Sequence, residues 1–75
     1  MNIQDRLTTQ TMISLTVVMK DGKERTTTDA FMALKDRGIK ADPADVTRSL
    51  IKLTQQGAIE QSTLKGLTAY RMVGA

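Results

Sequence analysis

The sequence predicts a small α+β domain, mainly α, in which three helices precede a C-terminal β-hairpin. Apolar residues recur at spacings of three and four up to about residue 53, and this spacing is typical of one face of a helix. Glycines at positions 22, 38 and 57 would end three such helices. After Gly57, a Lys-Gly pair separates two short segments with apolar residues at alternate positions, which indicates two strands joined by a turn.

The segment at about 2–20 is expected to form the first helix. Ile13 and Val17 lie four residues apart on a wide apolar stripe, which favours a helix. The alternation of apolar and polar residues from Ile13 to Met19 would also suit a strand that turns through "KDGK" into "ERTT". We favour the helix, with Gly22 at its C-terminal end.

The second helix is expected at about 28–37. The hydroxyl of Thr27 or Thr28 would cap its first turn, and Asp29 would place a negative charge near the positive end of the helix dipole. Gly38 would end the helix. Its buried stripe is expected to contain Ala30, Phe31 and Leu34.

The third helix, at about 43–56, has the clearest start and stop signals. Asp42 would cap it and Pro43 would occupy the first helical position. Asp45, three residues after the cap, would complete the capping arrangement, and Gly57 would end the helix. The buried stripe is expected to contain Val46, Leu50 and Leu53, and the residues that face away from it are Arg48, Ile51, Lys52 and Gln55.

The hairpin is expected at about 58–73, with its turn at the Lys-Gly pair of residues 65–66. Ile59, Tyr70 and Met72 would attach it to the core, because alternate residues of a strand share one face. Lys65 at the tip and Arg71 on the other face would then remain exposed.

Length and composition exclude several classes of protein. Seventy-five residues suffice for a single domain over residues 1–75. The chain has no Cys and no His, which excludes a disulfide, a thiol nucleophile, a histidine base and the usual zinc ligands. It also lacks the glycine-rich phosphate-binding motifs. We therefore expect no enzyme activity, no catalytic residues, no metal site and no small-molecule cofactor.

Signals for export or membrane insertion are missing from the sequence. The first ten residues lack a basic stretch followed by an apolar segment, and no apolar run approaches the roughly 20 residues that a membrane span needs. The expectation is a cytoplasmic protein without a membrane partner.

The positive charge lies towards the C-terminus. The net charge is +3, and residues 1–45 contain seven basic and seven acidic side chains, so they contribute none of it. Residues 46–75 contain four basic side chains and one acidic side chain. The third helix and the hairpin therefore carry the excess, as expected of a surface that faces a polyanion.

The run "VTRSLIKLTQQGAIEQSTLKGLTAYRM" resembles the third helix and wing of winged helix-turn-helix proteins. The residues that carry this resemblance are Val46, Leu50, Leu53, Gly57, Ile59, Tyr70 and Met72. With the upstream "RTTTDAFMALKDRGIKADPADV", it covers about residues 9–73, and the short wing and "AYRM" are most similar to small single-domain regulators of bacterial fimbrial operons. The resemblance implies a winged-helix DNA-binding protein that regulates bacterial or phage transcription.

In that family the third helix enters the major groove of double-stranded DNA, and the wing contacts the backbone. The resemblance implies DNA contacts by Thr28, Lys40, Thr47, Arg48, Lys52, Gln55, Lys65 and Arg71. Arg48 is the best candidate for reading guanine, because its guanidinium can pair with O6 and N7. The chain departs from the family in the two carboxylates at the start of the third helix, Asp42 and Asp45, and in having only Lys65 at the wing tip.

A second interpretation stays open, in which the winged helix binds a protein as an accessory factor or as an inhibitor of a host protein. It is suggested by Ile51, an apolar residue on the outer face of the third helix. Met12 and Met19 could line a dimer contact on the first helix. A protomer with few basic contacts would bind DNA weakly, so a homodimer or a partner regulator is expected.

Overall fold

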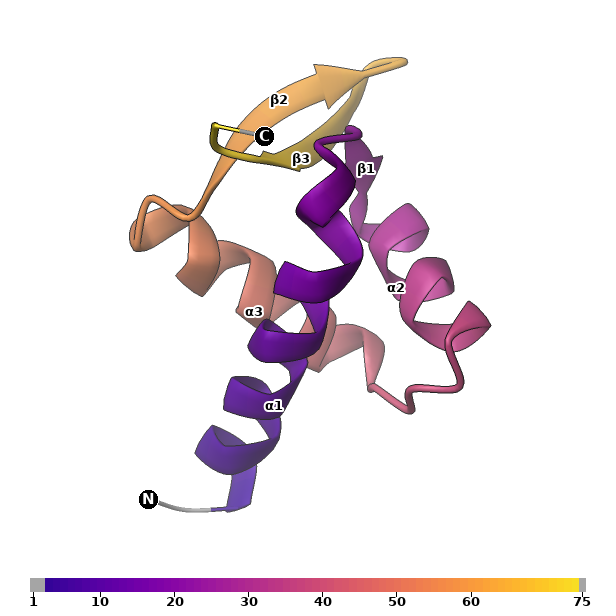
Figure 1. Ribbon diagram of the computed structural model, residues 1–75, viewed down its shortest axis with the longest axis vertical. Coiled ribbons are helices and arrows are strands. Elements are labelled where there is room, and N and C mark those ends of the chain that lie inside the picture. The colour runs from indigo at the N-terminus through magenta and orange to yellow at the C-terminus, as the bar shows by residue number, and fades with distance from the viewer. Residues whose placement is uncertain (1–2, 75) are drawn as a thin grey trace.

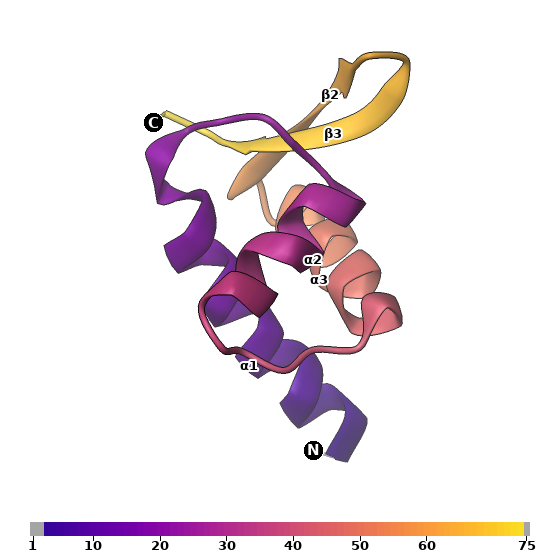
Figure 2. The same ribbon diagram turned by 90° about the vertical axis from the view of Figure 1, so that its right-hand side faces the viewer.

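The computed structural model describes residues 3–74, except for the side chains of residues 4 and 5. The helices are α1 (Ile3–Val18), which continues as a 3-10 turn (Met19–Asp21), α2 (Thr27–Asp36) and α3 (Pro43–Gln55). The strands are β1 (Arg25–Thr26), β2 (Ile59–Leu64) and β3 (Leu67–Met72). Position 2, where the first helix was expected to begin, lies outside the described residues. The three helices pack together, and the sheet lies across the end opposite the start of α1 (Figures 1 and 2).

The sheet has one strand more than the sequence predicted. Its order is β1-β3-β2, and both pairs of strands are antiparallel. The hairpin closes with Leu64 opposite Leu67, whereas β1 pairs only Arg25 and Thr26 with Tyr70 and Ala69. A strand of two residues has no alternating pattern of its own, and its partner lies far away in the sequence. The expected two-stranded hairpin is therefore corrected to a three-stranded sheet.

The core is formed by the apolar stripes that the helical spacing predicted. Ala30, Leu34, Val46 and Leu50 are fully buried, and they pack with the buried Leu53, Ile59 and Tyr70. The half-buried Phe31, Met12 and Met72 pack against this cluster. Burying these side chains is the main force that holds the three helices to the sheet.

Met19 is a core residue, which corrects its assignment to a dimer contact. Its side chain is fully buried and belongs to the same apolar cluster as Leu15 and Val18. The wide stripe on the first helix did not reveal this, because the sheet covers the end of α1 only in the folded chain (Figure 1).

The helix starts agree with the sequence in α3 and differ in α2. Asp42 caps α3, because its Oδ1 accepts a hydrogen bond from the backbone N–H of Ala44 at 2.8 Å, and Pro43 follows it. The cap of α2 is Thr26, not Thr27 or Thr28 as expected. Its hydroxyl accepts from the N–H of Asp29 and its own N–H donates to the Asp29 carboxylate, both at 3.1 Å. This reciprocal pair is a capping box.

The end of α3 places the wing beside that helix. Gly57 has a φ of +77°, a left-handed conformation that costs glycine least. In this conformation the N–H of Ala58 donates to the carbonyl of Leu53 at 3.0 Å, and the N–H of Gly57 donates to that of Thr54 at 3.1 Å. These two bonds satisfy the last carbonyls of α3. The chain then enters β2 directly, so the hairpin stays close to the helix.

Across residues 3–74, the structure contains no helix of the length and apolar character that a membrane crossing would require.

An ion pair connects the end of α1 to β1. Arg25 donates a hydrogen bond to each carboxylate oxygen of Asp21, both at 2.8 Å, and the backbone N–H of Lys23 donates to the same carboxylate at 3.0 Å. The Arg25 guanidinium and this N–H hold the pKa of Asp21 well below its ordinary value of 3.8. The hydrogen bonds with the Asp21 carboxylate raise the pKa of Arg25. The pair therefore stabilises the turn that leads from α1 into β1.

We expect this pair to make the stability of the fold depend on pH in the acid range. Because the pKa of Asp21 is lower in the folded chain than in the unfolded one, the pair contributes fully above about pH 4. Its contribution is lost as the pH falls through the folded-state pKa. Urea unfolding of the wild type and Asp21→Asn at decreasing pH measures this effect. The difference in unfolding free energy between the two should shrink toward low pH, and a constant difference would contradict the assignment.

Candidate nucleic-acid interface

A row of exposed side chains runs along the outer face of α3. Thr47, Ile51 and Gln55 lie four residues apart, and all three are exposed, with Ile51 46% exposed. At about 100° per residue they share the side opposite the buried stripe of α3. Lys52 is exposed beside them. We call Thr47, Ile51, Gln55 and Lys52 the outer face of α3, and its side chains offer a hydroxyl, an alkyl group, an amide and an ammonium.

The wing borders this face. A shallow cavity of about 130 Å³ lies between α3 and the hairpin. Ile51, Thr54 and Gln55 line it from α3, and Gln61 and Tyr70, which are opposite each other in β2 and β3, line it from the wing. The outer face of α3 and this side of the hairpin therefore form one continuous surface.

Arg48 is bound within the protein, which changes its expected role. Its Nη2 donates to Oδ1 of Asp45, three residues earlier on α3. Asp45 is largely buried against α1, where the hydroxyl of Thr8 also donates to it at 3.5 Å. A buried carboxylate needs such partners, because burial without them is unfavourable. The sequence suggested that Asp45 completes the cap of α3. Its carboxylate instead binds Arg48.

Arg71 is also in an ion pair. Its Nε donates to Glu60, which lies directly opposite in the neighbouring strand. Both side chains are about half exposed, and ion pairs of this kind contribute little to stability. Of the basic residues in 46–75, Lys52 and Lys65 form no ion pair with any described residue. The positive surface is therefore weaker than the charge count predicted.

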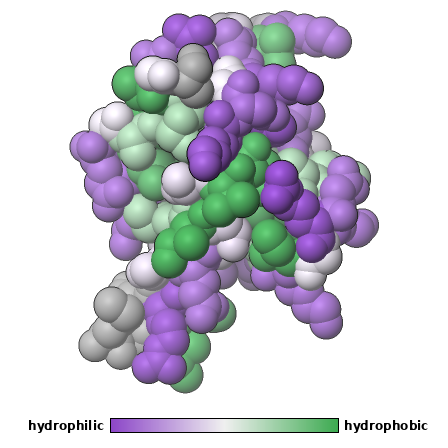
Figure 3. All heavy atoms as spheres, in the orientation of Figure 1, coloured by the Kyte–Doolittle hydropathy of each residue, from purple (hydrophilic) through white to green (hydrophobic). Residues whose placement is uncertain are grey.

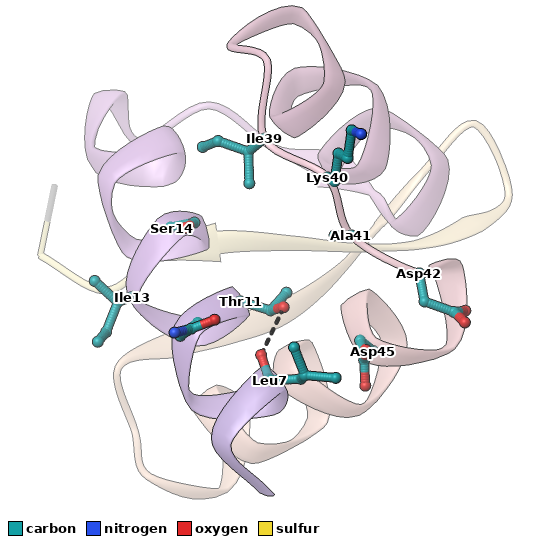
Figure 4. Close-up of a pocket in the computed structure, with 10 residues that line it drawn as sticks. Leu7, Thr11, Ile13, Ser14, Ile39, Lys40, Ala41, Asp42 and Asp45 are labelled. Carbon is teal, nitrogen blue, oxygen red and sulfur yellow. Dashed lines mark hydrogen bonds between the residues drawn. The ribbon is translucent and has the colours of Figure 1, made fainter. Parts of the chain in front are cut away.

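The structure separates the remaining expected contacts. Thr28 is exposed in the first turn of α2, and Lys65 is exposed at the tip of the hairpin. Lys40, in the loop between α2 and α3, lines a different cavity, across from residues of α1 (Figure 4). Asp45 lines that cavity as well, on the side of α3 that faces α1. Lys40 is thus grouped with α1 and not with the outer face of α3.

Sequence reasoning missed these two ion pairs, although a signal for each was present. Asp45 and Arg48 are three residues apart, a spacing at which oppositely charged side chains meet on a helix. The pairing of Arg71 with Glu60 depends on the strand register, which the Lys-Gly turn at residues 65–66 determines. Counting residues outward from that turn would have placed the two opposite each other.

No protein-family model matches the sequence, and no curated protein sequence does so either. The fold is similar to a solved structure of the ferric uptake regulator from Francisella tularensis with iron, with a TM-score of 0.73 and 26% sequence identity. The match covers 88% of this chain and 53% of the other, so this chain spans about half the length of that regulator. That structure was solved with iron, whereas the described residues here contain no cluster of metal-ligating side chains and the sequence has no Cys or His. The chain thus has the expected winged helix-turn-helix fold, and it shares this fold with a solved regulator.

Proposed function

We propose that this chain is a sequence-specific double-stranded DNA-binding protein that regulates transcription in the cytoplasm of a bacterium or during phage infection. The observation that carries the proposal is the exposed outer face of α3 beside the hairpin wing, in a fold similar to that of a regulator. In a winged helix this face enters the major groove while the wing follows the backbone. The absence of a catalytic residue pattern in the sequence agrees with a binding role.

The side chains on this face favour A·T base pairs over G·C. The Gln55 amide has the donor and acceptor needed to pair with N6 and N7 of adenine, and the alkyl group of Ile51 can contact the methyl group of thymine. The hydroxyl of Thr47 donates to the carbonyl of Pro43 at 3.1 Å, so it is left to accept a hydrogen bond from the amino group of a base. Arg48 could pair with guanine only after releasing Asp45. Base readout is therefore assigned to Gln55 and Ile51, in place of Arg48.

Contacts with phosphates would orient the helix without reading sequence. Lys52 and Lys65 are available for this role, and the exposed hydroxyl of Thr28 can donate to a phosphate. Arg71 can join them at small cost, because its ion pair with Glu60 is exposed. With about three basic contacts, the logarithm of the binding constant should fall with that of the salt concentration with a slope of about −3. Such weak electrostatic binding favours a homodimer or a partner regulator on the DNA.

Selection from a random duplex library, followed by fluorescence anisotropy on the selected site, tests the proposal. We expect Gln55→Ala to weaken binding to the selected site by roughly 10- to 100-fold, the value of a lost base contact, with little effect on unrelated DNA. Lys52→Ala should weaken binding to both and reduce the salt slope by about 1. Lys35→Ala is the matched control, because Lys35 is an exposed lysine in the last turn of α2.

Two results would refute the proposal. One is the absence of binding to any duplex at low salt. The other is DNA binding whose affinity stays at the wild-type value in Gln55→Ala and Lys52→Ala, as it should in the control. DNA would then contact another surface.

A second candidate function is binding to a protein through the same face. The exposed Ile51 lines the shallow cavity with Tyr70 of the wing, an arrangement that could receive an apolar side chain of an accessory or host protein. A partner that is retained from lysate after nuclease treatment, and lost with Ile51→Asp, would favour this function. A partner lost on nuclease treatment would instead favour DNA binding.

A further inference from the structure

The outward face of α1 is apolar although it is exposed. Ile3, Leu7, Ile13 and Val17 keep between 47% and 75% of their surface exposed. Apolar side chains gather over α1 in the view that faces this helix (Figure 3). We call these four residues, together with Gln10, the α1 stripe. A helix that faced only water would carry polar and charged residues on this side.

The stripe consists of four apolar side chains and the neutral amide of Gln10. No residue from Leu7 to Val17 is charged, and Arg6 is a single cation near the start of the stripe, so this face offers little attraction to the phosphates of DNA. Contiguous exposed apolar surface of this kind marks contact with a protein. Because four of its five side chains are apolar, another apolar surface is the complementary partner.

The spacing of the stripe is symmetric about Gln10. Ile3 and Val17 are each seven residues from Gln10, and Leu7 and Ile13 are each three residues from it. If two copies of α1 cross antiparallel at Gln10, Ile3 of each copy lies against Val17 of the other. Leu7 of each copy then lies against Ile13 of the other. A two-fold interface requires this kind of self-complementary surface. Such a pairing also brings no like charges together at its centre. The charged side chain nearest to Gln10 on this side of α1 is that of Arg6, and it would lie opposite Ser14 of the other copy.

The protein surface next to the stripe has a groove that can receive side chains of a second helix. A cavity of about 670 Å³ lies between α1 and the loop that joins α2 to α3. Leu7 and Ile13 line one side of it, and Ile39 lines the other, with Lys40 and Asp42 further along the loop (Figure 4). Gln10 of α1 lines it as well. Side chains of a second α1 could enter this groove while its own groove receives those of the first.

We propose that the α1 stripe is a homodimer interface on which α1 of a second copy packs antiparallel, with Gln10 on the two-fold axis. The interface does not depend on DNA binding, and it replaces the dimer contact once expected at the buried Met19. We expect a reversible dimer, with a dissociation constant in about the micromolar range.

Sedimentation equilibrium of the full chain without DNA tests the association. The wild type should change from monomer to dimer as its concentration rises to hundreds of micromolar. Ile13→Lys should stay monomeric over the same range, and its circular dichroism should match the wild type because Ile13 is exposed. Thr16→Lys is the matched control on the same helix, since Thr16 is exposed outside the stripe, and it should dimerise like the wild type. A wild type that remains monomeric would overturn the proposal.

Cysteine crosslinking tests the antiparallel arrangement, since the chain has no Cys of its own. Gln10→Cys should form a disulfide-linked dimer under mild oxidation at least about tenfold faster than Thr16→Cys. Ile3→Cys mixed with Val17→Cys should give the mixed dimer in preference to either homodimer. Equal rates for Gln10→Cys and Thr16→Cys would overturn the proposed axis. A chain that dimerises in this way but binds no DNA would refute the proposed function and support the interface. A chain that binds DNA but stays monomeric would support the proposed function and refute the interface.

Discussion

Replacing Leu50 with alanine should lower the free energy of unfolding by about 3 kcal/mol, within the 2–5 kcal/mol that large-to-small substitutions in cores cost. Leu50 is fully buried on α3 and belongs to the cluster that contains residues of all three helices and the sheet. Its truncation removes packing and leaves a cavity at the centre of a thin core. A domain of this size has a total stability of roughly 4–11 kcal/mol, so the loss would be a large part of the whole. Urea denaturation followed by circular dichroism measures it.

The next residue provides the control. Ile51→Ala removes a comparable amount of alkyl side chain from the same turn of α3, but Ile51 is 46% exposed on the outer face. We expect the unfolding free energy to change by no more than about 0.5 kcal/mol, as is usual for surface positions. Similar losses for Leu50→Ala and Ile51→Ala would mean that α3 is rotated about its axis relative to the structure described here.

The fold could be predicted because its signals are local. In α3, Asp42, Pro43 and Gly57 mark the ends, and the spacing of Val46 and Leu50 marks the buried side, all within sixteen residues. Each of these features acts through the backbone of its own helix, so the sequence alone reveals it. β1 has no such signal, because its two residues become a strand only by pairing with Tyr70 and Ala69.

The candidate site was predictable only in part, for the same reason. The turn of about 100° per residue in a helix predicts that Ile51, Lys52 and Gln55 lie on the outer face of α3. The structure shows them exposed there. The state of Arg48 depends on Asp45, and the burial of Asp45 depends on α1, whose Thr8 lies 37 residues away in the sequence. The burial of Met19 likewise results from tertiary packing. Local patterns therefore indicated which side chains lie on a face, but not which of them are already bound within the protein.

The pair between Asp45 and Arg48 leads to a prediction of a large gain in DNA binding. Asp45→Asn keeps the shape of the side chain but removes its charge, so Arg48 loses its charged partner. We expect DNA affinity to rise about tenfold and the salt slope to become steeper by about 1, because one more cation faces the phosphates. Stability should fall by about 1–2 kcal/mol, less than for a fully buried pair, since the Arg48 side chain is 43% exposed. Anisotropy titrations at several salt concentrations and urea denaturation measure the two effects.

A double variant separates the release of Arg48 from the simple loss of a negative charge. If the guanidinium makes the new contact, Asp45→Asn combined with Arg48→Ala should bind DNA no more tightly than the wild type, and its salt slope should return to the wild-type value. A double variant that keeps the gain of Asp45→Asn would show that the Asp45 carboxylate merely repels phosphates through space. Arg48 would then have no part in binding. The comparison is informative even if both variants are less stable, because the affinity of the folded fraction and its salt slope are measured below the unfolding temperature of each.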